Sequence, residues 1–77
     1  MELNERILEL AIMNELERDK IPVTVTLTNG TELQGVVVRN DLLVVVLDTD
    51  GVQRILYKHS IAYLTPLTPV KCASHRK

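Results

Sequence analysis

A lysine and a histidine stand side by side at Lys58 and His59, within a segment that reads Tyr-Lys-His-Ser-Ile from residue 57 to residue 61. The residues up to Leu56 and the residues 61–64 have the composition of β-strands. The pair therefore falls in a tight link between two apolar strands. These residues alone leave two interpretations open: an ordinary polar turn, or a site that the fold exists to present.

Catalytic chemistry is not indicated by these residues or by others in the chain. His59 and Ser60 are not a nucleophile and its base, because neighbours along a strand point to opposite faces. The sequence has no glycine-rich phosphate loop and no repeated acidic motif. Cys72 and His75 have the spacing of half a zinc site, but two such ligands in a tail are much more often incidental. We expect no enzyme, no catalytic residue, no metal site and no cofactor.

The composition limits how the chain can bind a partner. Its 77 residues suffice for one domain, and at this size a solitary core only marginally offsets the entropy of ordering the chain. Aromatic residues make up 3% of the chain, so few flat faces are available for stacking on a base or sugar. Nine basic and ten acidic residues give a net charge of −1, so any attraction to nucleic acid must be local.

The cellular compartment is indicated by what the sequence lacks. Cys72 is the only cysteine, so no disulfide can form within the chain and a reducing compartment is expected. The N-terminus is acidic, and nowhere do the roughly 18 consecutive apolar residues needed to span a bilayer occur. We expect a cytoplasmic protein that does not bind membranes or a small-molecule substrate.

The first structural element is a helix over residues 4–18, which are strong helix formers with Asn4 as a candidate cap. Its apolar residues form two stripes: Leu3, Ile7, Leu10 and Ala11, and then Leu8, Ile12 and Leu16, with Met13 off both. This surface is too wide for a helix that rests on one sheet. The helix is either half sunk in its own core or also touches a neighbouring subunit.

The period then changes from helix to strand. Pro22 prevents continuation of the helix, and residues 23–28 alternate between aliphatic side chains and threonine. Asn29-Gly30 is the strongest short signal for a hairpin. The second strand, residues 31–39, contains Gly35, which suggests a bend or bulge there.

Residues 42–47 are six apolar residues in succession, which predicts a strand covered by protein on both faces. The next turn, residues 48–51, is expected to be type I with Gly51 in the left-handed position. Strands follow at residues 52–57 and 61–64, and after Pro66 we expect a flexible tail over residues 67–77. The predicted fold is mainly β: an N-terminal helix and a small, bent, five-stranded antiparallel barrel over residues 1–66.

Strands this apolar favour edge-to-edge addition of a neighbouring copy, which we expect to close into a ring. The sequence resembles the Hfq family of bacterial RNA chaperones, within the larger Sm-like group. The resemblance covers residues 9–66. Residues 29–35, Asn-Gly-Thr-Glu-Leu-Gln-Gly, are similar to the family's Asn-Gly-x-x-Leu-x-Gly, and residues 57–61 are very close to its Tyr-Lys-His-Ala-Ile.

The resemblance implies a homohexameric ring in which the strand holding Val44 to Leu47 meets the strand over residues 61–64 of a neighbouring subunit. It also implies that Lys58 and His59 line the inner rim of the helix-bearing face. There they would bind uridine-rich single-stranded RNA through phosphate, ribose or uracil contacts. The implied site on this face comprises Glu9, Asp41, Leu42, Leu43, Tyr57, Lys58 and His59.

The sequence departs from the family pattern at several implied binding positions. Glu9 stands where the family has a uracil-recognising glutamine, and Leu42-Leu43 replace a polar residue and a stacking aromatic. Each lost stacking contact is worth about 1–3 kcal/mol. On the opposite face, where A-rich RNA would bind more weakly, the implied residues are Thr26, Gly30, Thr31, Leu33 and Gln34, with Glu32 at a commonly basic position. On the outer rim, the family's arginine cluster corresponds to Asn14, Glu17 and Arg18.

The sequence thus predicts a hexameric, Hfq-like RNA chaperone and post-transcriptional regulator of stress responses, whose partners are single-stranded RNA and its own copies. The alternative is an Sm-like ring that acts as a protein scaffold and has weak or lost RNA binding. The near-neutral charge, the missing aromatics and the acidic residues at positions 9, 17 and 32 favour this alternative.

Overall fold

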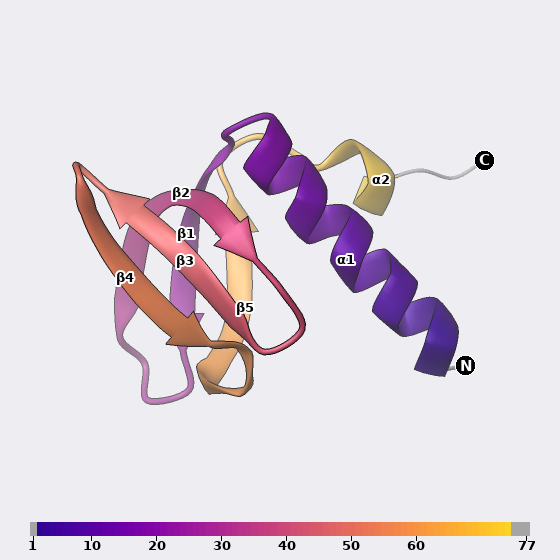
Figure 1. The fold of residues 1–77 in the computed structure, drawn as a ribbon, viewed down its shortest axis with the longest axis horizontal. Coiled ribbons are helices and arrows are strands. Elements are labelled where there is room, and N and C mark those ends of the chain that lie inside the picture. The colour runs from indigo at the N-terminus through magenta and orange to yellow at the C-terminus, as the bar shows by residue number, and fades with distance from the viewer. Residues whose placement is uncertain (1, 75–77) are drawn as a thin grey trace.

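The computed structural model describes the backbone of residues 2–74 and the side chains of residues 8–72. A long helix is followed by a bent sheet, and a short helix lies against the long one (Figure 1). In chain order the elements are α1 (Glu2–Arg18), β1 (Pro22–Leu27), β2 (Glu32–Asn40), β3 (Val44–Thr49), β4 (Val52–Tyr57), a 3₁₀ turn (Lys58–Ser60), β5 (Ile61–Pro66) and α2 (Lys71–Ser74). No helix of this described part is long and apolar enough to cross a membrane.

The strands form one antiparallel sheet in the order β4-β3-β2-β1-β5. The predicted fold class is therefore confirmed: a helix precedes five short strands that bend around a common core. The expectation that β3 meets a neighbouring subunit is wrong, because β2 and β4 occupy both of its hydrogen-bonding edges. The strands with an unpaired edge are β4 and β5.

The core lies where α1 packs against the bent sheet. Leu16, Val25, Val37, Val45 and Leu47 are fully buried there. Met13 joins this core, although the helical pattern placed it off both apolar stripes. Of the stripes, Leu16 is buried, Ile12 packs at the edge of the core and Leu8 stays 47% exposed. The side chains of Leu3, Asn4 and Ile7 lie outside the described residues.

The apolar run at residues 42–47 divides into a loop and a strand. Leu42 and Leu43 are exposed in the loop, and β3 begins only at Val44. The Asp41 carboxylate accepts hydrogen bonds from the backbone N–H groups of Leu43 and Val44, both at 2.9 Å. Because of this turn, β3 begins two residues after the start of the apolar run. Within β3, Val45 and Leu47 are fully buried while Val44 and Val46 are half-buried, since one face covers the core and the other is only partly sheltered.

The turn between β3 and β4 has the left-handed Gly51 that the sequence predicts, but it is not type I. Asp50 and Gly51 have φ values of 52° and 88°, and two positive φ angles in a two-residue hairpin loop define a type I′ turn. The twist of that turn matches the twist of the two strands. Gly51 also donates its backbone N–H to the Asp48 carboxylate at 2.9 Å.

Gly35 is required by a close approach and not by a bulge at its own position. A Cβ at residue 35 would clash with the backbone carbonyl of Asp48 in β3. The irregularity in the pairing of β2 with β3 lies further along, between Val37 and Arg39. The bend of the sheet therefore combines a bulge near residue 38 with close packing at residue 35.

The C-terminal segment after Pro66, the predicted end of the domain, packs against the rest of the domain. Leu67 donates its N–H to the carbonyl of Pro22 at 2.8 Å, and Val70 is only 4% exposed within the core. The core of the domain thus extends to Val70, and Cys72 packs at its margin. The prediction of a flexible tail also covers residues 75–77, which lie outside the described residues together with His75 of the considered zinc half-site.

Candidate functional site

The link that carries Lys58 and His59 is a single 3₁₀ turn between the two edge strands. Its backbone is held from two sides. Lys58 donates its N–H to the carbonyl of Leu43 at 2.8 Å, and the Ser60 carbonyl accepts the N–H of Thr28 at 2.9 Å. The loop before β3 and the hairpin after β1 therefore fix the turn through main-chain groups.

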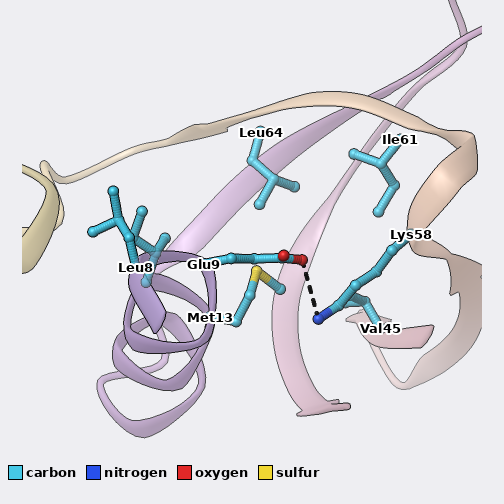
Figure 2. Close-up of a pocket in the computed structure, with 8 residues that line it drawn as sticks. Leu8, Glu9, Met13, Val45, Lys58, Ile61 and Leu64 are labelled. Atoms are coloured by element: carbon cyan, nitrogen blue, oxygen red, sulfur yellow. Dashed lines mark ion pairs between the residues drawn. The ribbon is translucent and has the colours of Figure 1, made fainter. Parts of the chain in front are cut away.

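The side chain of Lys58 points back toward α1 and into the molecule (Figure 2). Its Nζ atom lies 3.4 Å from Oε2 of Glu9, an ion pair between a lysine side chain that is 14% exposed and a glutamate that is 53% exposed. The Nζ atom is shielded from solvent and has no partner with hydrogen-bond geometry. A shielded ammonium with donors to spare can serve a group that enters from outside.

A pocket of about 390 Å³ opens beside this ion pair. Apart from Glu9 and Lys58 its walls are aliphatic or methionine side chains from α1, β3 and β5 (Figure 2). The wall residues are Leu8, Ile12, Met13, Val45, Ile61 and Leu64. The pocket joins a low-dielectric wall to one cation and one anion, which is the usual composition of a small-ligand site.

His59 has a different position from Lys58, although the two are neighbours. Its side chain is exposed and its ring lies 6.1 Å from the ring of Tyr57, with the planes tilted by 35°. Tyr57 is also exposed. The two rings form an accessible aromatic pair outside the pocket, where a hydrogen-bond donor and a stacking face are available to a ligand.

Asp41 has a positioning role on this face. Its hydrogen bonds from the N–H groups of Val44 and Leu43 lower the pKa of the carboxyl group. The carboxylate thus stays ionised and shapes the loop that exposes Leu42 and Leu43. These two leucines, with Glu9 and Leu10, line a second cavity of about 300 Å³. Glu9 therefore stands between the two cavities and belongs to the wall of both.

On the opposite face, the residues implied by the resemblance do not share one environment. Gly30, Thr31 and Gln34 are exposed, and Gly30 has a φ of 91° in the hairpin turn. Thr26 is buried, and Leu33 packs against the core. The side chain of Thr26 thus offers little to a ligand in this conformation.

On the outer rim, hydrogen bonds and an ion pair already engage the polar residues of α1. Arg18 and Asp19 form two contacts, at 2.9 and 3.2 Å, and this pairing raises the pKa of Arg18 and lowers that of Asp19. Asn40 donates its amide to Glu17 at 2.7 Å and to Asn14 at 3.5 Å. The exposed Arg18–Asp19 pair is weak and can open for a ligand, whereas the Asn40–Glu17 hydrogen bond is partly buried.

The sequence predicted one site from Glu9, Asp41 and residues 57–59, and in the structure Glu9 pairs with Lys58 while the loop of Asp41 hydrogen-bonds to the backbone of Lys58. It missed the pocket walls and the direct pairing of Glu9 with Lys58. A signal for the walls exists in the helix, where Leu8 and Ile12 as well as Glu9 and Met13 are four residues apart and so share a face. The partner surface on β5 has no comparable local signal.

A helix, a bent antiparallel sheet with two free edges, and a cationic turn between those edges form the arrangement of an Sm-like domain. A family model described as the Hfq protein matches residues 9–71. The RNA-binding protein Hfq of Moorella thermoacetica is 50% identical over 58 residues, covering 75% of this chain and 69% of the relative. The RNA-binding protein Hfq of Clostridium perfringens is 43% identical over 58 residues, covering 75% of this chain and 72% of the relative.

Solved structures agree with these relatives. The crystal structure of the pleiotropic translational regulator Hfq is similar with a TM-score of 0.72 and 35% identity, covering 82% of this chain and 94% of that one. The crystal structure of an Hfq protein from Anabaena is similar with a TM-score of 0.69 and 29% identity, covering 75% of this chain and 93% of that one. The chain therefore belongs to the Hfq family.

Proposed function

We propose that this protein is an RNA chaperone that forms a homohexameric ring and binds uridine-rich single-stranded RNA on the helix-bearing face. The observation that carries the proposal is the position of the 3₁₀ turn. It joins β4 to β5, the two strands with free edges, and it bears Lys58 and His59. Assembly through those edges repeats the turn once in every copy, so that modest contacts become multivalent.

The two edge strands are suited to this assembly. Both have an unpaired row of backbone groups, and they carry exposed apolar side chains at Val52, Ile55 and Tyr63. Such edges invite pairing with another chain. Relatives of this chain are RNA-binding proteins, and that likeness supports the proposal of a non-catalytic role in cytoplasmic post-transcriptional regulation. Binding of A-rich RNA on the opposite face is expected to be weaker because Thr26 is buried.

Light scattering with an absorbance ratio tests the assembly and its nucleic-acid content together. We expect six times the chain mass of 8.7 kDa. Titration with short oligo-U and oligo-A at one stated salt concentration then tests the site. The Lys58→Ala/His59→Ala double variant should weaken oligo-U binding by about tenfold or more, since every copy loses two contacts.

Lys20→Asn is the matched control, because it removes an exposed positive charge elsewhere and asparagine tolerates the positive φ of 53° at that position. Unchanged oligo-U binding in the double variant would refute the assigned site. A hexamer that binds no RNA even at low salt would instead favour the scaffold function.

A further inference from the structure

The positions of Lys58 and His59 divide their roles toward a bound strand. The Nζ atom of Lys58 is shielded from solvent and faces the pocket beneath α1, whereas His59 is exposed. A phosphate on a strand that runs over the surface can be reached by His59. The Nζ atom of Lys58 reaches only a group that enters the pocket, unless the ion pair between Lys58 and Glu9 breaks.

A phosphate is a poor occupant for this pocket. Its charge would lose hydration against aliphatic walls and would stand beside the carboxylate of Glu9, 3.4 Å from the ammonium. A neutral, flat ring avoids both costs, because its faces can rest on aliphatic side chains while its polar edge meets the ion pair. The volume of about 390 Å³ is at the small end of the roughly 300–1,000 Å³ that is usual for ligand pockets.

The ion pair presents a donor beside an acceptor, which restricts the base it can read. Lys58 donates only and the Glu9 carboxylate accepts only. Uracil and guanine match this pair, since each has a carbonyl oxygen next to a ring N–H. Cytosine and adenine have a ring nitrogen with a lone pair at that position, which would face the carboxylate. Guanine has a further amino group, so both oxygens of Glu9 can accept from one base.

We infer that the Glu9–Lys58 pair reads the edge of an inserted keto base and ranks guanine above uracil. This inference rests on the proposed function, because it names the base preference of the same RNA site. Glu9 is then a specificity-determining residue, and among uridine-rich strands the chain favours those that also contain guanosine.

A set of hexanucleotides tests the preference. The strands are six uridines and the same strand with one internal uridine replaced by guanosine, inosine or adenosine; a single guanosine avoids quadruplexes. For the wild type we expect the guanosine strand to bind about tenfold more tightly than six uridines. The inosine strand should bind like six uridines, because inosine lacks the amino group, and the adenosine strand should bind most weakly.

Glu9→Gln provides the decisive variant. Its amide keeps one acceptor and gains a donor, which suits uracil, so the ratio of guanosine to uridine affinity should fall to within about twofold of unity. Asp50→Asn removes the same charge at an exposed position in the turn between β3 and β4, where asparagine tolerates the φ of 52°, and should leave the ratio unchanged. Glu9 is itself 53% exposed, so loss of folding is not expected to obscure the result.

The outcomes separate this inference from the proposed function. Oligo-U binding that depends on Lys58 and His59, without a guanosine preference in the wild type, overturns the inference alone. A guanosine preference that persists in Glu9→Gln also overturns it, as does inosine binding as tightly as guanosine. Failure of the wild type to bind any of the four strands refutes both.

Discussion

The buried carboxylate of Glu15 in α1 accepts a hydrogen bond from the backbone N–H of Lys71, the first residue of α2, at 2.8 Å. Its second oxygen accepts the N–H of Cys72 at 3.2 Å. One side chain thus satisfies two backbone donors of the short helix that ends the described structure.

Acidification should weaken the contact between Glu15 and α2. The N–H of Lys71 is the main cause that lowers the pKa of Glu15 below its usual 4.5. A carboxyl group with a depressed pKa in the folded state contributes stability above about pH 4.5, and this contribution is lost as the pH falls through the folded value. Glu15→Gln should therefore unfold at a lower temperature than wild type at pH 7, and the difference should shrink toward pH 3. Glu32→Gln serves as the exposed control, and a difference that does not change with pH would contradict the prediction.

Removal of the C-terminal segment should destabilise the domain. Val70→Ala leaves a cavity in the core and should lower the free energy of unfolding by about 1–2 kcal/mol. A chain that ends at residue 66 should lose more, because it also lacks the Glu15 contacts. Urea unfolding measures both, with the exposed Leu67→Ala as control. Equal stability of the shortened and full chains would restore the boundary at Pro66.

Gly35→Ala should disturb the packing of β2 against β3. The added Cβ would meet the backbone carbonyl of Asp48, which cannot move aside as a flexible side chain could. We expect a loss of about 1–3 kcal/mol, as for other forced overpacking. Thermal unfolding of this variant measures the effect, with the exposed Thr31→Ala as control. If Gly35→Ala were as stable as wild type within experimental error, β2 and β3 would have to move apart at little cost, and the prediction would be wrong.

A charge on an edge strand should dissociate the proposed ring without unfolding the chain. Ile55 on β4 is 65% exposed, so Ile55→Asp removes apolar surface from the edge but little from the core. The mass by light scattering should fall below that of the hexamer while the circular dichroism spectrum persists. Leu67→Asp, at an exposed position after β5, should leave the mass unchanged. A variant at Ile55 that stays hexameric would exclude this edge from the interface.

Sequence reasoning succeeded where the signal was local. The alternation over residues 23–28 and the Asn29-Gly30 pair predicted the first hairpin, and the segment around Lys58 predicted the turn between two strands. The start of β3 was misplaced because the side chain of Asp41 forms two backbone hydrogen bonds that interrupt an apolar run. Composition alone cannot reveal such a turn.

Long-range contacts account for the remaining errors. Glu15 and Lys71 are 56 residues apart, and the residues between them carry no pattern that announces their contact. The partners of β3 depended on which strands lie at the sheet edges, a property of the whole sheet. The pairing of Glu9 with Lys58 likewise joins a helix to a distant turn. The sequence shows that glutamate replaces the family's glutamine at residue 9, but it does not show that this glutamate forms an ion pair with Lys58.

The 3₁₀ turn at Lys58–Ser60 is fixed by the carbonyl of Leu43 and the N–H of Thr28, which bond to its backbone. These two hydrogen bonds to the turn thus do not involve the side chains that it displays. Different residues at positions 58 and 59 can therefore be exchanged while the support stays in place. The domain is in this sense a display scaffold, on which a two-residue insert from each copy would be repeated with the symmetry of the assembly.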